Sequence, residues 1–225
     1  MIPGGWDAIV RHYEETLAKH GATPRGVDWP SGSDLAVRFG LMLELLAETP
    51  ERPVLLDLGC GPGLALDYLA ATGGVERVQY HGIDLSSAMV DTARGRWPEH
   101  EFSCRDITME PLPEQSVDVV IMNGVLTERL SLSVETMTGL AESLIGAAFR
   151  IARIGIAFNV MSAHVDWQRD DLFHWPFDLL AGFLKREVSP HYEFRADYGL
   201  YEYTCFVRRR PRRPAAPARD SWWNR

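Results

Sequence analysis

The chain has 225 residues, of which 46% are hydrophobic and 24% charged, a composition typical of one globular α/β domain. Its net charge is −8, but the tail 208–225 carries +6, so residues 1–207 carry −14, which disfavours nucleic acid as a partner. No apolar run approaches the roughly 20 residues that cross a membrane, no signal sequence is visible, and the three cysteines are scattered. We therefore expect a cytoplasmic protein with free thiols and no membrane partner.

Helical and strand patterns alternate along the chain. Periodic apolar residues predict helices at 6–20 and 35–48, and Ser33 or Asp34 can cap the second. The elements predicted after them are strand 53–58, helix 64–72, strand 77–85, helix 87–96 capped by Ser86 or Ser87, strand 100–107, strand 116–125, helix 134–151, strand 153–161, helix 177–186 and strands 191–196 and 201–209. This order predicts a doubly wound, Rossmann-like fold with a mostly parallel seven-stranded sheet and an antiparallel C-terminal strand.

Composition divides the chain into three predicted parts. Residues 1–50 form an N-terminal helical lid, residues 51–209 the main domain, and residues 210–225 a tail rich in Arg and Pro. Such a composition predicts disorder in the tail. A contact between subunits through Trp222 and Trp223 is the alternative, and we expect a monomer or a homodimer.

The stretch LLDLGCGPGLAL, residues 55–66, predicts a ligand-binding turn. A buried strand ends there, Gly59, Gly61 and Gly63 permit a sharp turn, and a helix follows with its N-terminal N–H groups exposed. The nearest common motif is the dinucleotide fingerprint G-x-G-x-x-G. Leu64 stands where its third glycine belongs, which argues against a nicotinamide oxidoreductase.

Polar or glycine-rich residues also end the next three predicted strands. Asp84 ends the second strand, Asp106 and Ile107 end the third, and the run 123–125 (Asn-Gly-Val) ends the fourth. Each could by itself be a helix cap or a turn. Because ligands bind at the carboxyl ends of parallel strands, four such ends in succession predict a ligand site at this edge.

The segments DLGCGPG, GIDLSS, CRDI and MNGVL resemble the successive motifs of class I S-adenosylmethionine (SAM)-dependent methyltransferases of the small-molecule type, over about residues 53–160. The resemblance implies that Asp84 binds the ribose, Asp106 the adenine amine, and Asn123 faces the methionine part. The cofactor-binding residues that it implies are Asp57, Gly59, Cys60, Gly61, Gly63, Asp84, Leu85, Met89, Asp106, Ile107, Asn123, Gly124 and Val125. SAM is then the cofactor and S-adenosylhomocysteine its product.

The N-terminal stretch HYEETLAKHGATPRGVDW, followed by Arg38 and Phe39, is similar to a subgroup of these enzymes in which the segment covers the cofactor. Arg38 is a candidate partner for the methionine carboxylate, since a guanidinium pairs with a carboxylate through two bonds. An ordinary surface arginine is the alternative. Tyr13, His20 and Trp29 are candidates to close the pocket from above.

The predicted reaction transfers a methyl group to a small polar acceptor, most readily a hydroxyl of a sugar or of a natural-product intermediate. Polar and aromatic residues in 162–176 are candidates to line the acceptor side, with His164 as the first candidate base and His174 as the second. N-methylation of a small amine and a non-catalytic SAM-binding protein stay open as alternatives. No cysteine or histidine cluster has zinc spacing, so no metal is predicted.

Overall fold

The computed structural model describes residues 5–212, and one eight-stranded sheet forms its centre. The strands are β1 (Val54–Leu58), β2 (Gln79–Asp84), β3 (Glu101–Cys104), β4 (Val117–Met122), β5 (Ala152–Ser162), β6 (His174–Trp175), β7 (Tyr192–Arg195) and β8 (Glu202–Arg208). Their order is β3-β2-β1-β4-β5-β8-β7, and the short β6 pairs with β5 outside this path. Strands β1 to β5 are parallel to one another and β8 is antiparallel to β5, as the sequence predicts.

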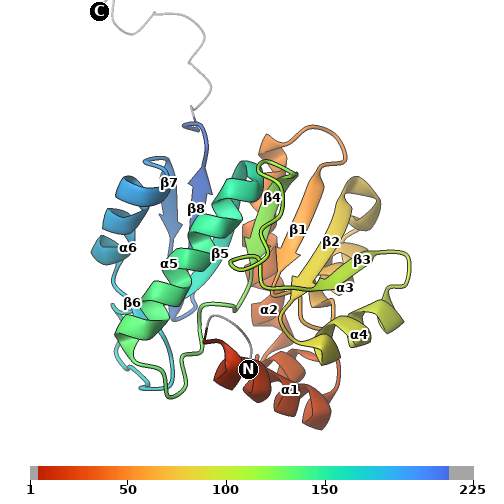
Figure 1. The fold of residues 1–225 in the computed structure, drawn as a ribbon, viewed down its shortest axis with the longest axis horizontal. Coiled ribbons are helices and arrows are strands. Elements are labelled where there is room, and N and C mark those ends of the chain that lie inside the picture. The colour runs from red at the N-terminus through yellow and green to blue at the C-terminus, as the bar shows by residue number, and fades with distance from the viewer. Residues whose placement is uncertain (1–4, 213–225) are drawn as a thin grey trace, which may run out of the picture.

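Helices flank the sheet on both faces (Figure 1). The α-helices are α1 (Asp7–His20), α2 (Gly32–Met42), α3 (Leu64–Ala71), α4 (Ser87–Arg96), α5 (Val134–Ile151) and α6 (Phe177–Phe183). Short 3₁₀ turns cover Pro24–Val27, Leu43–Glu48 and Val75–Arg77, and a π-helical turn covers Leu184–Val188. Figure 1 shows α1 lying across the carboxyl ends of β1 and β2.

Alternating side chains of the strands divide the core between the two faces. In β4, Val120 and Met122 pack with α5 and α6, whereas Val119 and Ile121 pack with α2, α3 and α4. Such near-continuous burial is expected for a parallel strand covered on both faces. Both faces are therefore closed by helices, and the strand ends beneath α1 are left to form a site.

Several element boundaries differ from the sequence-based expectation. Ser31 caps α2 by accepting the N–H of Asp34, so neither Ser33 nor Asp34 is the cap, whereas Ser86 caps α4 as predicted. The third and fourth strands end at Cys104 and Met122, because the residues after them turn toward the ligand edge.

The second predicted helix is α-helical only to Met42 and continues as a 3₁₀ turn, and helix 177–186 continues from Phe183 as the π-helical turn. β6 lies inside the segment 162–176, which has no strand in the prediction, because its two residues pair only with the end of β5. The sheet therefore has eight strands, one more than predicted.

The division at residue 50 and the tail from 210 stay predictions, and Trp222 and Trp223 lie outside the described residues. No helix among residues 5–212 is both long and apolar enough to cross a membrane.

We expect a chain that ends at Pro211 to keep its melting temperature within a few degrees. A chain that ends at Val207 serves as the contrast, because it removes two anchors. Arg208 Nε lies 2.9 Å from Glu48 Oε1, and Arg209 donates to the carbonyl of Ala152 at 2.6 Å. The melting temperature of the shorter chain should fall by about 2–4 °C for each kcal/mol of unfolding free energy that these contacts contribute. Calorimetry measures this fall. Aggregation or loss of a dimer in the chain ending at Pro211 would contradict the expectation and favour a contact through the tail.

Candidate functional site

The glycine loop after β1 is shaped by three residues with left-handed backbones. Gly59, Gly61 and Gly63 have φ angles of 78°, 53° and 84°, which glycine adopts without strain. A Cβ at Gly59 would lie 2.3 Å from Cγ2 of Val125, so the loop after β4 approaches too closely for any side chain there. The loop therefore forms a concave cradle at the end of β1.

The N–H groups of this loop are mostly used within the protein, which corrects the expectation of an exposed N–H cluster. Gly59 and Cys60 both donate to the carbonyl of Ile83, at 2.7 and 3.0 Å. Gly61 donates to Asp84 Oδ2 at 2.8 Å. An anionic phosphate would need those donors free, so the arrangement fits a ligand without phosphates.

Asp84 joins the loop to the start of α4. Its Oδ1 accepts the N–H of Ser86 at 2.9 Å, and its Oδ2 accepts that of Gly61. Burial raises the pKa of Asp84, and the backbone N–H groups act in the opposite direction. A carboxylate held in this way can still accept bonds from a ligand through its remaining lone pairs.

Two polar side chains that line the pocket have buried atoms without a partner. Asp106 Oδ1 accepts from the N–H and the hydroxyl of Thr108, at 2.8 and 2.6 Å, but its Oδ2 has no bond. Neither polar atom of the Asn123 side chain is bonded. Because an unpaired buried polar group is costly, these atoms indicate positions where a bound ligand completes the hydrogen bonding.

The pocket itself encloses about 1040 Å³, its open mouth included. Of the residues predicted to bind the cofactor, those that line this pocket are Asp57, Gly59, Cys60, Gly61, Asp84, Leu85, Met89, Asp106, Ile107, Asn123, Gly124 and Val125. Gly63 is not among the lining residues and is the N-cap residue of α3.

Asp57 supports the floor of the pocket. Tyr80 donates its hydroxyl proton to Asp57 Oδ2 at 2.7 Å, and burial raises the pKa of Asp57 to about 7. The Cys60 thiol is buried beside it, and burial raises its pKa. The Cys60 thiol is therefore not a reactive thiolate, and the Asp57 carboxyl group does not behave as an exposed one does.

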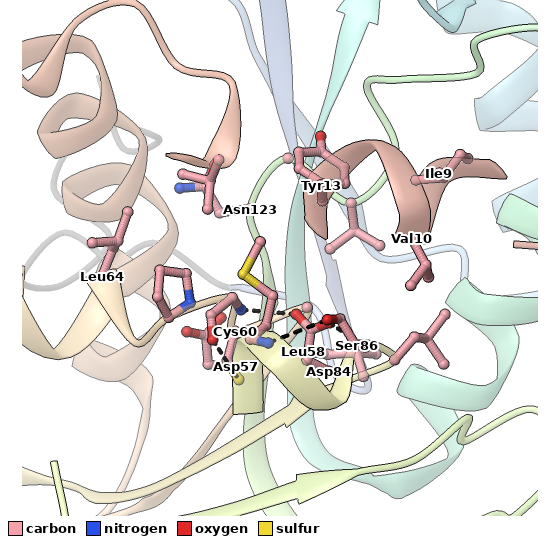
Figure 2. A pocket seen from close by; sticks show the side chains of 18 of the residues that line it. Ile9, Val10, Tyr13, Asp57, Leu58, Cys60, Leu64, Asp84, Ser86 and Asn123 are labelled. Carbon is pink, nitrogen blue, oxygen red and sulfur yellow. Dashed lines mark hydrogen bonds between the residues drawn. The ribbon is translucent and has the colours of Figure 1, made fainter. Parts of the chain in front are cut away.

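The pocket is covered by α1 and by the segment before α2. Ile9, Val10 and Tyr13 of α1 lie across the pocket from Asp57 and Asp84 (Figure 2). Trp6, Val27, Trp29, Leu35 and Phe39 complete this cover. The expectation that Tyr13 and Trp29 close the pocket is confirmed, whereas His20 is not among the lining residues.

One contact attaches this cover to the start of α4, and two join α1 to the segment before α2. Glu14 accepts the hydroxyl proton of Ser86 at 2.7 Å, and Thr16 donates to the carbonyl of Gly26 at 2.9 Å. His12 Nε2 lies 2.5 Å from Asp28 Oδ2. The sequence analysis missed Ser86 and Glu14 in these roles. The cap position of Ser86 was the available signal, since it places the hydroxyl at the pocket edge.

Arg38 does not line the pocket directly. Its Nε donates to Glu202 Oε1 at 2.8 Å in a buried ion pair, and its guanidinium lies over the Trp29 ring, 3.8 Å from the centroid. Its Nη1 is buried without a partner. The alternative that Arg38 is an ordinary surface arginine is therefore wrong. Binding of the methionine carboxylate by Arg38 stays a prediction.

The two histidines predicted as bases lie beyond the end of β5, outside the pocket lining. His164 stacks on Phe177 with ring centroids 5.2 Å apart. His174 Nε2 accepts the N–H of Arg169 at 3.3 Å, and its Nδ1 lies 2.7 Å from the carbonyl oxygen of Ser162. The structure therefore groups the residues predicted to bind the cofactor but places neither histidine among them, and the cofactor-binding and catalytic roles stay predictions.

No three His, Cys, Asp or Glu side chains in the described part of the chain come together as a metal-ligand set.

The family described as a methyltransferase domain matches residues 55–144. A Mycobacterium tuberculosis (strain ATCC 25618 / H37Rv) protein, Rv1506c, is named as a methyltransferase and is 33% identical over 156 residues, which are 68% of this chain and 91% of that protein. The trans-aconitate 2-methyltransferase of Paracidovorax citrulli is 41% identical over 86 residues, 37% of this chain and only 32% of that enzyme.

Among solved structures, magnesium protoporphyrin IX methyltransferase from Synechocystis PCC 6803, with bound SAM, has a TM-score of 0.54 and 15% identity, and the match covers 93% of each chain. At that identity the likeness shows the fold alone.

The strand order, the glycine cradle and the polar strand ends define a methyltransferase of the Rossmann-like type. The chain belongs to the class I SAM-dependent methyltransferases. It is an enzyme that transfers the methyl group of SAM.

Proposed function

We propose that this enzyme methylates a hydroxyl of a small polar acceptor, a sugar or a natural-product intermediate. The observation that supports a small acceptor is the cover of the pocket. Ile9, Val10 and Tyr13 of α1, together with Trp29, lie over the strand ends. A macromolecule would have to displace this cover, whereas a small molecule can enter through the open mouth. The match to trans-aconitate 2-methyltransferase covers a third of that enzyme and supports no acceptor.

The same proposal assigns roles to the pocket residues. Asp84 would bind the ribose hydroxyls, the free Oδ2 of Asp106 the adenine amine, and the unpaired amide of Asn123 the methionine end. When bound, SAM supplies a methyl group that its sulfonium already activates. The residues of the chain then orient the acceptor and exclude water, which is where much of the rate enhancement arises.

We expect Asp84→Ala to weaken SAM binding by about 1–3 kcal/mol, roughly 5- to 150-fold in Kd, because the ribose hydroxyls lose their acceptor. Isothermal calorimetry on the folded variant measures this. Asp91→Ala is the matched control, since Asp91 is an exposed acid on α4 paired only with Arg94. Unchanged affinity in a folded Asp84→Ala protein would reject the assignment.

If His164 is the base, His164→Ala keeps SAM affinity and loses about 10²–10⁴-fold in turnover. The ring has no hydrogen bond in the described structure and could turn from Phe177 toward an acceptor. Steady-state assays of S-adenosylhomocysteine formation check this, with His191→Ala as a control histidine at the far end of the sheet. A loss below about tenfold would exclude the base role and make the same variant of His174 the next test.

A further inference from the structure

Glu128, which the sequence analysis did not single out, is a half-buried acid held at a fixed place beside the pocket cover. Glu128 forms an isolated antiparallel β-bridge with Leu172. On either side, Phe173 donates its N–H to the carbonyl of Thr127 at 2.7 Å, and Leu130 donates to that of Asp171 at 2.9 Å. The loop after β4 is therefore fastened to the segment before β6, and Glu128 lies at their junction.

The neighbouring charges are already paired, but Glu128 is not. His12 of α1 binds Asp28, and Arg169 forms an ion pair with Asp171. Within residues 5–212 the Glu128 carboxylate has neither a hydrogen bond nor an ion pair. The Glu128 oxygens are not among the buried atoms that lack a partner, so the carboxylate can be reached from solvent and can accept a hydrogen bond or a proton from a ligand.

Tyr13 connects Glu128 to the pocket. Its side chain lines the pocket, and Figure 2 shows its hydroxyl pointing away from Asp84. Burial and then the Glu128 charge raise the pKa of Tyr13, whereas a side-chain hydrogen bond with Thr127, the residue before Glu128, lowers it, so the phenol stays protonated. No hydrogen bond joins Tyr13 and Glu128 in the structure. A phenol that donates and a carboxylate that accepts thus face one region at the edge of the pocket.

The protonation of Glu128 suits proton transfer near neutrality. Burial raises the pKa of Glu128 to about 7, and the charges of Asp28 and Asp171 add to the rise. His12 and Arg169 act in the opposite direction. A base works best when its pKa is near the working pH.

We propose that the acceptor's nucleophilic atom binds between the Tyr13 hydroxyl and the Glu128 carboxylate, and that Glu128, in place of His164 or His174, takes its proton. This inference rests on the proposed methyl transfer. The acceptor's oxygen or nitrogen bonds to the methyl carbon as the carbon–sulfur bond breaks. The electron pair of that bond goes to sulfur, and the proton of the acceptor goes to Glu128. Tyr13 donates a hydrogen bond that orients the nucleophile.

The same groups define the acceptor class. Asp28, Glu128 and Asp171 place three acids at this junction, two of them already paired. A neutral hydroxyl or a protonated amine is compatible with this charge, whereas a polycarboxylate such as trans-aconitate is repelled. The acceptor therefore carries a removable proton on oxygen or nitrogen and no cluster of carboxylates.

The first experiment compares Glu128→Gln with wild type. A panel of sugar hydroxyl compounds, small primary amines and trans-aconitate is screened for S-adenosylhomocysteine formation. A hydroxyl or amine compound should be methylated and trans-aconitate should not. With the compound found, Glu128→Gln should lose about 10²–10⁴-fold in turnover while its calorimetric SAM affinity stays unchanged. Glu76→Gln, at an exposed acid in the turn before β2, is the control with unchanged turnover.

The pH profile separates the two acceptor kinds. For a hydroxyl acceptor, kcat/KM of wild type should rise with pH up to about 7 and then level, because only ionised Glu128 accepts a proton. For an amine acceptor a second rise follows the amine's own pKa. Glu128→Gln should lose the rise that ends near pH 7. Methylation of trans-aconitate, or less than threefold loss in Glu128→Gln, would overturn the inference.

A second measurement needs no acceptor. In protein with ¹³C-labelled glutamate side chains and bound S-adenosylhomocysteine, the resonance missing from Glu128→Gln identifies Glu128. It should titrate near pH 7, and titration near the ordinary value of about 4.3 would overturn the inference. The proposed function fails instead if wild type does not bind SAM, which calorimetry reports separately.

Discussion

A Gly59→Ala variant is expected to lose about 2–5 kcal/mol of folding stability and to bind SAM too weakly to measure. The left-handed backbone at Gly59, with φ of 78°, costs an alanine about 1–2 kcal/mol. The added Cβ would also lie 2.3 Å from Cγ2 of Val125, and overpacking of this kind typically costs about 1–3 kcal/mol. Denaturant unfolding measures the first effect and calorimetry the second.

Two further variants separate strain from crowding. Gly73→Ala has a similar φ of 68° but nothing within 4 Å of the new Cβ, so it should show the strain alone. Adding Val125→Ala to Gly59→Ala removes the methyl that clashes and should recover the crowding part of the loss. Equal losses in Gly59→Ala and Gly73→Ala would contradict the close approach of the two loops.

That the candidate cofactor residues lie together could be predicted, because they follow strand ends that can be recognised in the sequence. Asp84, Asp106 and Asn123 each come at or just after the end of a strand, and the topology places all three at one edge. The N–H groups of the glycine loop could not be predicted in the same way. Their partners, the carbonyl of Ile83 and the carboxylate of Asp84, lie on β2, and Asp84 is 23 residues from Gly61.

The acceptor side depends on contacts between distant segments. Glu128 stands in a sequence that resembles an ordinary polar loop, and only the fold brings His12, Asp28 and Asp171 around it. The sequence analysis instead favoured the histidines of 162–176, because imidazole is the common base near neutral pH. A carboxylate is as suitable a base as imidazole near neutral pH only when burial raises its pKa. Burial depends on the tertiary structure and cannot be read from the sequence.

The Arg38–Glu202 pair is a second case, since its partners are 164 residues apart. Replacement of Glu202 by leucine is expected to cost about 3–5 kcal/mol, because the buried guanidinium of Arg38 is left without its counter-charge. Tyr198, whose hydroxyl lies 3.4 Å from Glu202 Oε1, loses a weaker contact. Denaturant unfolding of Glu202→Leu measures the loss.

The double variant Arg38→Met/Glu202→Leu separates the ion pair from cofactor binding. With both charges gone, most of the lost stability should return, since apolar replacements of a buried pair are often neutral. The buried, unpaired Nη1 of Arg38 is well suited to the methionine carboxylate. The double variant should therefore fold yet bind SAM at least about tenfold more weakly, the size of a lost charged hydrogen bond. Arg94→Met, at an exposed site on α4, should bind as wild type does. If the stable double variant binds SAM as tightly as wild type, Arg38 has only a structural role, the ion pair that joins α2 to β8.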